Sequence, residues 1–501
     1  MDTLQSLAYG FGVCLTPENL LYCFSGVLMG TLVGVLPGLG PSATISLLLP
    51  MIFHAPAVSS IIMLAGICYG AQYGGSTTSI LLNIPGEVSS VVTCLDGHQM
   101  AKQGRAGPAL GIAAFGSFIA GTCGIIGLMM FAPFLANFAL RFGPAEFFSL
   151  GVMSLTLVTY VSRGSLIRGL MMACVGIIMS TVGMDPFTSR TRFTFGLTSL
   201  LDGFELVYVA MGFFGLSEVL VNLGQSMEQE TVQTKIKNLL PTRQDWKDSA
   251  KPIARGTIIG FFLGTLPGFG NAVTTFISYA IERKFSKHPE KFGKGAIEGV
   301  AGPESANNAA SSGTFIPLLS LGIPVNPSTA ILVGALLILG LQPGPLLISS
   351  RPDLFWGVIA SMYIGNVMLV VLNLPLIGLW VQILKVPYSL LYVFIVLLCQ
   401  IGAYSVNNSV NDVLMVNIFG LAGYLMKRYE FEGTPLIMAL VLGNMLENSL
   451  RRALMISDGD PTVFFTRPIS AVFLTVALVF LISPIFTRER IGKTVIELQE
   501  E

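Results

Sequence analysis

The chain has 501 residues, of which 52% are hydrophobic and only 11% are charged. A soluble domain carries about a quarter of its residues as charges, so this composition excludes an ordinary soluble protein and indicates a polytopic protein of the lipid bilayer. The 28 basic and 28 acidic residues cancel, which removes the electrostatic basis for binding nucleic acid.

The first distinctive stretch along the chain is Gly26 to Thr44, GVLMGTLVGVLPGLGPSAT. Proline removes an amide donor and glycine destabilises helices, so the central LPGLGP predicts a break between two apolar helices. No charged residue occurs between Glu18 and Glu87, and the first basic residue is Lys102. Because basic loops stay in the cytoplasm, the lack of basic flanks favours an approach from the outer side.

A second interruption lies within the apolar stretch from Ser59 to Pro85. Its polar section, GGSTTSILLNIPG from Gly74 to Gly86, predicts unwound chain at membrane depth. The segment from Asp96 to Arg105 holds the first basic residues and is expected to be a cytoplasmic loop. Apolar runs predict further spans near 110–140, 145–161, 166–184 and 206–223.

The longest hydrophilic stretch, residues 225–252, predicts a cytoplasmic linker between two transmembrane halves. The predicted domains are a first transmembrane repeat at 1–224, this linker, and a second repeat at 253–501 that carries extra C-terminal spans. Later apolar runs predict spans near 331–348, 354–384, 390–404, 413–426, 435–447 and 469–486.

The stretch from Gly256 to Ile281, GTIIGFFLGTLPGFGNAVTTFISYAI, has no charge and is long enough to cross a bilayer once as a helix. Its centre, LPGFGN, predicts a break. Basic residues flank the stretch on both sides, so both ends are expected in the cytoplasm. This pattern favours a re-entrant hairpin over the alternative, a kinked ordinary span.

The two proline–glycine stretches are copies of one another. Placed against Gly256 to Thr274, the stretch from Gly26 to Thr44 matches at eight of nineteen positions without a gap. In each copy three glycines spaced by four precede the proline, a pattern that suits close helix packing. Because their flanks differ in charge, the copies are expected to enter from opposite faces. The predicted fold is an all-α polytopic membrane protein with two inverted structural repeats, re-entrant hairpins, broken helices and about 10–12 transmembrane spans.

The second half also contains a polar stretch inside apolar sequence. Gly302 to Thr329 reads GPESANNAASSGTFIPLLSLGIPVNPST, and no Lys or Arg occurs from 295 to 350. Unwound chain at membrane depth is therefore expected here too. Ile323-Pro324 matches Ile84-Pro85 of the first half, although a two-residue slip is needed to pair the neighbouring leucines.

Helix breaks expose amide N–H groups, which favour anions, and carbonyl ends, which favour cations such as Na⁺. Hydroxyl and amide side chains beside the breaks can hold a carboxylate in the same place. The candidate substrate-binding residues are Gly38, Gly40, Ser76, Thr77, Thr78, Asn83, Gly268, Gly270, Asn271, Asn307, Asn308, Ser311, Ser312 and Thr314. The alternative is that these small residues only let helices pack closely.

Acidic residues inside a membrane are functional candidates by default. Glu304 is a candidate to bind a coupling cation, to cap a half-helix, or to stand at a cytoplasmic mouth. Glu447 and Arg451 are four residues apart on a predicted helix, the spacing of an ion pair. A structural pair is favoured over a role for Arg451 in attracting an acidic substrate.

Catalytic signatures are missing from the sequence. Gly492-Lys493-Thr494 has Thr487 where a nucleotide-binding loop needs its first glycine, so ATP is not expected to drive this chain. No serine-protease or aspartyl-protease motif and no cluster of metal ligands occurs. No metal site and no tightly bound cofactor are expected, and a passive channel stays open as an alternative.

Several long motifs resemble a known family. They are LVGVLPGLGPSATISLLLP, YGAQYGGSTTSILLNIPGE, CLDGHQMAKQGRAGPAL, GTLPGFGNA, GVAGPESANNAASSGTFIPLLSLGIP and GLQPGP. Together they resemble TctA, the large membrane subunit of the tripartite tricarboxylate transporters. The resemblance implies a permease of the bacterial inner membrane that takes up citrate-like carboxylates by ion-coupled secondary transport. It also implies two partners, a small transmembrane subunit and a periplasmic substrate-binding protein.

The sequence thus predicts a secondary transporter of small carboxylates whose site lies at the membrane midplane between hairpins and broken helices. One repeat bundle is expected to move against the other to alternate access, in the manner of an elevator. Because the predicted site holds few basic residues, helix N-termini and a co-bound Na⁺ or H⁺ must neutralise the substrate. An intramembrane enzyme and a passive anion channel are the alternatives, distinguished by chemical turnover and by uphill uptake.

Overall fold

The computed structural model describes residues 3–36, 40–162, 165–223, 238–383 and 388–487. Within these ranges the regular secondary structure is helical apart from one pair of two-residue strands, β1 (Gly183–Met184) and β2 (Thr191–Arg192). Seven helical stretches of the described chain are long and apolar enough to cross a membrane: Pro17–Val35, Ala57–Leu82, Ala106–Ala139, Pro144–Val161, Leu206–Leu223, Pro352–Asn373 and Leu390–Asn407. The prediction of an all-α membrane protein is confirmed, and the exact number of spans stays a prediction.

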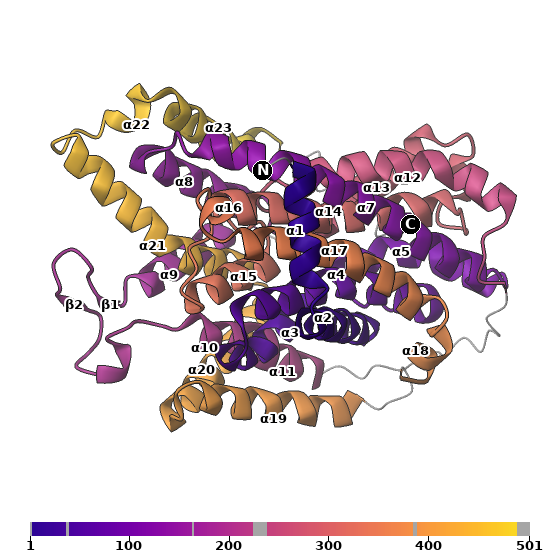
Figure 1. Ribbon diagram of the computed structural model, residues 1–501, viewed down its shortest axis with the longest axis horizontal. Helices are drawn as coiled ribbons and strands as arrows, with labels where there is room; N and C mark the ends of the chain where they lie inside the picture. The colour runs from indigo at the N-terminus through magenta and orange to yellow at the C-terminus, as the bar shows by residue number, and fades with distance from the viewer. Residues whose placement is uncertain (1–2, 37–39, 163–164, 224–237, 384–387, 488–501) are drawn as a thin grey trace. The chain divides into compact units, whose positions relative to one another are not determined.

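The chain divides into two compact units, and their helices are labelled in Figure 1. Unit 1 comprises residues 1–140 and 205–428, and unit 2 comprises residues 141–204 and 429–501. Each unit therefore contains a piece of both predicted halves. This division follows contacts in space, so the predicted repeat boundaries at 224 and 253 stay a prediction.

Unit 1 contains two sets of three helices in the same order. The first set is α2 (Pro17–Val35), α3 (Pro41–Leu48) and α4 (Ala57–Leu82); the second is α12 (Arg243–Gly264), α13 (Gly270–Phe285) and α14 (Glu298–Leu321). In the first set α2 packs along α4, and in the second α12 packs along α14. The duplicated sequence thus forms duplicated local structure.

The spaced glycines explain why these helices can approach so closely. A Cβ atom on Gly26 would lie 2.2 Å from the carbonyl oxygen of Met63 in α4, and one on Gly260 would lie 2.2 Å from that of Ala306 in α14. Any larger residue on this face would push the backbones apart. The glycine pattern therefore predicted the helix contact correctly.

The glycine contacts also fix how the two sets correspond. Gly30 of α2 and Gly260 of α12 are equivalent in the sequence match, and they contact Ile67 of α4 and Ala306 of α14 respectively. Residues of α4 therefore correspond to residues of α14 that lie 239 positions later in the chain. The same shift pairs Ile84-Pro85 with Ile323-Pro324. The two-residue slip that the leucines required is therefore absent from the structural correspondence.

The predicted unwinding across Gly74–Gly86 and Gly302–Thr329 is wrong for most of both stretches, because α4 and α14 continue as regular helices to Leu82 and Leu321. Ser and Thr hydroxyls bond back to carbonyls of the same helix, as Ser79 does to Gly75 at 2.9 Å. Such bonding suits a helix that must satisfy its own polar groups in lipid. Broken helices are confirmed, but the breaks are short.

The two short breaks have the same geometry. Asn83 and Gly322 end their helices in the left-handed conformation, with φ of 57° and 72°. Four residues further on, Glu87 and Asn326 are both extended with φ of −145°, and each is the first residue of a capping box. Because these pairs again differ by 239 residues, the backbone of the break is itself repeated.

The proline–glycine tips are described only in part. In the first copy residues 37–39, including Gly38, lie outside the described residues. In the second copy α12 ends at Gly264 and α13 begins at Gly270, which confirms the predicted break. Gly268 has a φ of +85°, a conformation that glycine adopts at no steric cost, and its N–H donates to the carbonyl of Val325 at 3.0 Å. Whether each hairpin is re-entrant stays a prediction.

The other elements of unit 1 surround these sets. They are α1 (Thr3–Cys14), α5 (Val91–Thr93), a π-helical turn (Cys94–His98), α6 (Gln99–Lys102), α7 (Ala106–Ala139), α10 (Leu206–Ala210), a second π-helical turn (Met211–Leu216), α11 (Ser217–Leu223), α15 (Pro327–Ile338), α16 (Leu347–Ser350), α17 (Pro352–Asn373), α18 (Ile377–Ile383), α19 (Tyr388–Asn407) and α20 (Val410–Arg428). Short 3-10 turns lie at Leu49–His54, Val88–Ser90 and Pro289–Lys291.

The expected loop from Asp96 to Arg105 is mostly helical, and His98 is buried with its ring 3.2 Å from the carbonyl of Ile80. Packing against α4 accounts for this difference.

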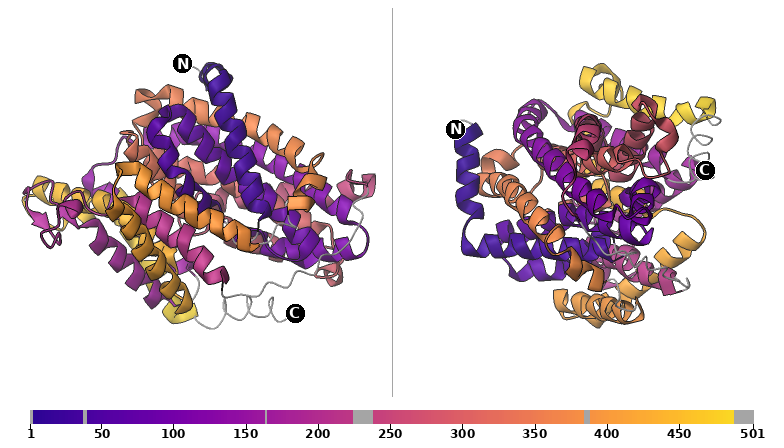
Figure 2. Two further views of the ribbon diagram at one scale, coloured as in Figure 1. Left: turned by 90° about the horizontal axis from the view of Figure 1, so that it is seen from below. Right: turned by 90° about the vertical axis from the view of Figure 1, so that its right-hand side faces the viewer.

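Unit 2 is a smaller helical bundle made of α8 (Pro144–Val161), α9 (Leu166–Ser180), α21 (Gly433–Ile456), α22 (Val463–Thr466) and α23 (Pro468–Thr487). Helix α21 packs against α8 and α9, and α23 packs against α8 (Figure 2). A 3-10 turn, Thr198–Leu200, follows the strand pair. A Cβ atom on Gly176 would lie 2.2 Å from the carbonyl oxygen of Leu436, so glycine allows close packing here as well.

Candidate functional site

The beginnings of the short helices after the breaks meet within unit 1. The hydroxyl of Ser42, at the start of α3, lies 2.9 Å from that of Ser328, at the start of α15. In the same way α13 of the second half lies beside the turn Val88–Ser90, which follows the break at the end of α4 in the first half. Each hairpin therefore contacts the break that belongs to the other half of the sequence.

Asn271 connects the second hairpin tip to α14. Its side-chain amide donates to the carbonyl of Asn307 at 2.9 Å, to the side-chain oxygen of Asn307 at 3.0 Å, and to the hydroxyl of Ser311 at 2.9 Å. Asn307 and Ser311 are buried. The structure thus brings together three residues that the sequence predicted for the site.

Two helix N-termini near these contacts have free amide groups. Neither α3, which follows Gly40, nor α13, which begins at Gly270, has a side-chain cap within the described chain. Helix α15 differs, because Asn326 and Thr329 form a capping box that occupies its first amides. Uncapped N-termini carry a partial positive charge and donors that suit a carboxylate.

Two acids lie between α4, α5 and α14. Glu304 is 1% exposed and accepts hydrogen bonds from the hydroxyls of Ser76, at 2.6 Å, and Thr93. Glu87 accepts from the side-chain amide of Asn307 at 3.2 Å and from the hydroxyl of Ser89. Neither carboxylate forms an ion pair within the described residues. Glu87 is only partly buried, whereas Glu304 is fully buried. A buried charge without such compensation is costly, so a proton or a bound cation on Glu304 is favoured.

The structure narrows the roles that the sequence left open for Glu304. Helix α14 begins at Glu298, so Glu304 lies in its second turn and does not cap its N-terminus. Its burial also excludes an exposed position at a cytoplasmic mouth. Cation binding by Glu304 stays a prediction.

The remaining candidate side chains have different surroundings. Three hydroxyls bond to a carbonyl of their own helix, namely those of Thr78, Ser312 and Thr314. The side-chain amide of Asn308 donates to the hydroxyl of Ser117 at 2.7 Å and to the carbonyl of Glu304 at 3.1 Å. Asn83 is exposed at the end of α4, and Thr77 lines a small cavity between α4 and α7.

Sequence reasoning missed two features of this region. Glu87 was not proposed, although it is the first acid after the uncharged stretch and follows the Ile84-Pro85 motif after one glycine. The pair formed by Tyr73 and Asn366, whose side chains lie 2.7 Å apart, joins α4 to α17. No pattern along the chain links these two residues, because they are almost 300 positions apart.

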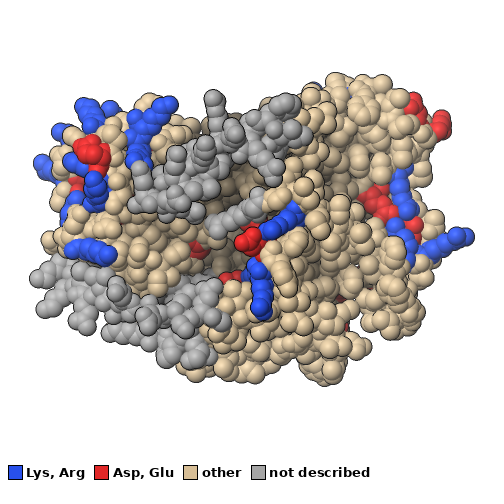
Figure 3. Space-filling model, turned by 180° about the vertical axis from the view of Figure 1, so that it is seen from behind, with Lys and Arg blue, Asp and Glu red and all other residues tan. Residues whose placement is uncertain are grey.

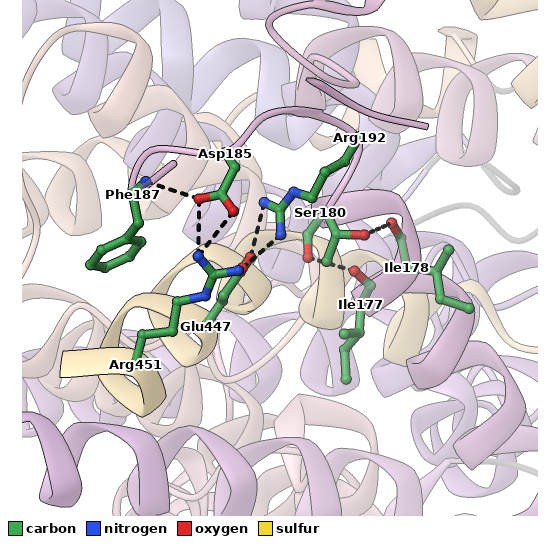
Figure 4. A network of polar contacts seen from close by, with 9 residues as sticks. Ile177, Ile178, Ser180, Asp185, Phe187, Arg192, Glu447 and Arg451 are labelled. Atoms are coloured by element: carbon green, nitrogen blue, oxygen red, sulfur yellow. Dashed lines mark hydrogen bonds and ion pairs between the residues drawn. The ribbon is translucent and has the colours of Figure 1, made fainter. Parts of the chain in front are cut away.

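The acid–base pair in unit 2 belongs to a network of ion pairs. Glu447 and Arg451 form the predicted ion pair at 2.7 Å, and Arg451 also contacts both oxygens of Asp185 at 3.0 Å (Figure 4). Arg192 donates to Glu447 from the strand β2, also at 2.7 Å. The Phe187 amide, which donates to Asp185, and the adjacent Arg451 lower the pKa of Asp185 to about 2. The guanidinium of Arg451 is thus occupied by two carboxylates.

Charged side chains are unevenly distributed over the surface. On the face shown in Figure 3, Lys and Arg stand in separate groups, and wide areas between them carry no charge. Long stretches of exposed apolar side chain also occur on the spanning helices, such as Phe134 at 71% and Met130 at 63% exposure on α7. Such surfaces suit contact with lipid.

Comparison with known proteins places the chain in context. The family model described as "Tripartite tricarboxylate transporter TctA family" matches residues 20–438. A protein of Agrobacterium vitis named "Uncharacterized 52.8 kDa protein in TAR-I ttuC' 3'region" is 50% identical over 501 residues, which cover the whole of both chains. A second Agrobacterium vitis protein, "Uncharacterized protein in TAR-II ttuC' 3'region", is 54% identical over 223 residues, 44% of this chain and 92% of its own length. No solved structure matches the chain.

Proposed function

Because the chain belongs to the tripartite tricarboxylate transporter TctA family, we propose that it takes up di- or tricarboxylates such as citrate by secondary transport driven by Na⁺ or H⁺. Family membership makes it a multi-pass membrane subunit of a three-part transporter and not an enzyme. The proposal adds the substrate class, the driving ion and the place where the substrate binds.

One observation carries the proposed site: two uncapped helix N-termini in unit 1 lie next to buried polar side chains, the start of α3 beside Ser328 and the start of α13 beside Asn307 and Ser311. The first turns of α3 and α13 offer amide donors, and the Asn271–Asn307–Ser311 cluster lies beside the start of α13. Helix N-termini stabilise anions without a basic side chain. A substrate with two or three negative charges then needs a cation as well, which is the physical reason for ion coupling.

The reciprocal contacts of the two halves support alternating access. Helix α3 lies beside α15, and α13 lies beside the turn at Val88–Ser90, as a pseudo-two-fold axis requires. The basic flanks of the second hairpin, and their absence around the first, support an inverted relation of the repeats. In the proposed cycle one repeat bundle moves against the other like an elevator, and both hairpins and every candidate substrate residue lie in unit 1.

The proposed partners follow from the three-part system. A periplasmic binding protein delivers the carboxylate, and a small transmembrane subunit completes the permease in the bacterial inner membrane. Much of the choice among carboxylates then rests with the binding protein, while this chain recognises the charge and size of the anion.

Uptake by proteoliposomes that contain all three components tests the proposal. We expect labelled citrate, or the dicarboxylate that the binding protein prefers, to accumulate above its outside concentration when an inward Na⁺ or H⁺ gradient is imposed. Uptake that only equilibrates would instead support the anion channel. Accumulation that ignores both gradients would contradict the proposed coupling.

A matched pair of variants tests the location of the site. Asn271→Ala removes three hydrogen bonds beside the start of α13. Ser154→Ala removes a buried hydroxyl in unit 2 that bonds only to its own helix, at Leu150. We expect the first variant alone to raise the KM for uptake. Equal behaviour of the two variants would move the site elsewhere.

A further inference from the structure

Unit 1 contains a small buried cavity outside the Asn271–Asn307–Ser311 cluster. It lies between α4, α7 and the end of α17, and its polar lining comes from Tyr73, Ser76, Thr77, Ser117 and Asn373. The cavity has room for about one water molecule. All five side chains are at least nine-tenths buried, so a polar occupant there would be held by protein oxygens on several sides.

Asn373 presents an unused acceptor in this cavity. Its side-chain nitrogen donates to the carbonyl of Leu369 at 2.9 Å, which fixes the orientation of the amide. Its side-chain oxygen has no hydrogen-bond partner among the described residues, although the side chain is only 5% exposed. A buried oxygen left in this way costs free energy unless an occupant of the cavity contacts it.

The electrostatics around the cavity favour a positive occupant. Ser76 lines the cavity and donates its hydroxyl proton to Glu304 at 2.6 Å, which leaves the lone pairs of the hydroxyl oxygen for an occupant. Asn373 is the last residue of α17, where the helix carries a partial negative charge. Glu304 has no ion-pair partner in the described part of the chain, so a cation here would compensate a charge that is otherwise buried alone.

We propose that this cavity is the binding site for the coupling Na⁺, held by oxygens of Asn373, Thr77, Ser76 and Ser117 and balanced by the carboxylate of Glu304 through Ser76. Leu110, Ala113 and Ala114 complete the wall of the cavity, and the polar groups that its lining offers are oxygens, which suit a hard cation. The small volume suits one ion that has lost its water shell. The physiological meaning of the site rests on the proposed function, whereas ion binding itself does not.

The site also has a route to the substrate cluster. Asn308 donates to Ser117 in the cavity wall and to the carbonyl of Glu304 on its own helix. The neighbouring Asn307 contacts Glu87 and Asn271. An ion that fixes α14 against α4 and α7 therefore also fixes the residue that holds the α13 tip, so that ion and substrate bind cooperatively.

Thermal unfolding of the purified full chain tests the proposal without substrate. We expect the midpoint to rise with Na⁺ concentration at constant ionic strength, with choline as the replacement ion, because a ligand that binds only the folded state stabilises it. Direct binding of ²²Na⁺ to the same preparation provides a second measurement. A wild-type chain that responds equally to Na⁺ and choline and binds no ²²Na⁺ would overturn the site and leave a buried water as its occupant.

Thr77→Val is the sharpest variant, because it removes one cavity oxygen and nearly conserves volume. We expect the apparent Kd for Na⁺ to rise about tenfold, the loss typical of one contact to a charged group. The matched control is Thr156→Val in unit 2, where a similarly buried hydroxyl bonds to Val152 of its own helix. Na⁺ affinity that Thr77→Val leaves unchanged would place the ion elsewhere.

Asn373→Ala is the alternative variant if Thr77→Val does not fold. It too should weaken Na⁺ binding about tenfold or more. The outcomes for the site and for the transporter can be separated. Uptake that runs on H⁺, with no Na⁺ binding, would refute the cavity site and keep the transporter. Intact Na⁺ binding with no carboxylate uptake by the complete three-part system would keep the cavity site and refute the proposed transporter.

Discussion

Glu304 in unit 1 and Glu447 in unit 2 show two ways to hold an acid inside the same chain. Glu447 is 18% exposed in its side chain and lies between two arginines, Arg192 and Arg451. Glu304 is more deeply buried, at 1%, and is held by two hydroxyls without a basic partner among the described residues. An acid paired with arginine is neutralised permanently, whereas an acid held by hydroxyls can be neutralised by an ion that comes and goes.

This difference distinguishes acids that are paired with arginine from acids that are available to bind an ion. In unit 2 the acids Glu146, Asp185 and Glu447 each have an arginine, and these pairs join α8 to the segment before α23 and the strand pair to α21. In unit 1, by contrast, Glu87 lies at the first repeated helix break, and both Glu87 and Glu304 are held by hydroxyl and amide side chains. The two regions therefore predict opposite responses to the same substitution.

Removing the charge of each acid should give the largest contrast. We expect Glu304→Gln to reduce ion-driven uptake in proteoliposomes about a hundredfold, because the Gln side chain still fits between Ser76 and Thr93 but no longer balances a cation. Glu447→Gln should lower the thermal midpoint and leave uptake per folded protein close to wild type. The comparison would fail if Glu447→Gln abolished uptake in well-folded protein, or if Glu304→Gln transported normally.

A second test removes the close contact that holds α14, and with it Glu304, against α12. A Cβ atom on Gly260 would lie 2.2 Å from the carbonyl oxygen of Ala306, so Gly260→Ala should destabilise the fold by about 2 kcal/mol. Gly12 in α1 has no atom within 4 Å of the same position and is the control. Thermal unfolding should separate the two alanine variants clearly. Equal midpoints would mean that α12 and α14 are further apart than the glycine contact requires.

The structure shows which parts of this organisation a sequence can predict. The spaced glycines and the proline–glycine break are encoded by a few neighbouring residues, so both α12 and its break at Gly264 to Gly270 could be predicted. The length of the unwound segments could not, because Ser and Thr hydroxyls return to their own helix in α4 and α14. Local polarity alone does not distinguish these two uses of a hydroxyl.

The site was predicted in part for a similar reason. Asn271, Asn307 and Ser311 were expected because each lies close to a proline or glycine break, and the structure places them in contact. Glu87 and Asn373 were not expected, because their surroundings come from helices far away in the chain. Conversely, Asn83 matched the pattern of a site residue but is an exposed helix end, a role that its left-handed conformation explains.

A third test measures how much the α13 tip contributes to substrate binding. Asn271→Asp keeps the shape of the side chain but replaces a donor with an acceptor beside Asn307 and Ser311. The added negative charge also repels a carboxylate near the start of α13. We expect the KM for uptake to rise about tenfold while Na⁺ stabilisation of the substrate-free chain stays unchanged. A loss of Na⁺ binding in this variant would mean that Na⁺ and the carboxylate share one site, and that the cavity and the Asn271 cluster are not separate sites.

The smallest effect concerns the acid that arginine neutralises most completely. The amide of Phe187 and the guanidinium of Arg451 lower the pKa of Asp185 to about 2, well below the usual value near 4. A lowered pKa means that the carboxylate stabilises the fold fully above about pH 4, and that this contribution is lost as the pH falls towards 2.

The difference in thermal midpoint between wild type and Asp185→Asn should therefore be constant from pH 7 to about pH 5 and shrink as the solution becomes more acidic. Asp202→Asn, at an exposed position two residues after the Thr198–Leu200 turn, should show no such pH dependence. Na⁺ binding should be unaffected by Asp185→Asn at every pH, because Arg451 holds Asp185 as a fixed charge of unit 2 while the proposed ion site lies in unit 1. A Na⁺ response that followed the titration of Asp185 would mean that the arginine-paired acids also take part in coupling, and the distinction between these acids and those available to bind an ion would have to be redrawn.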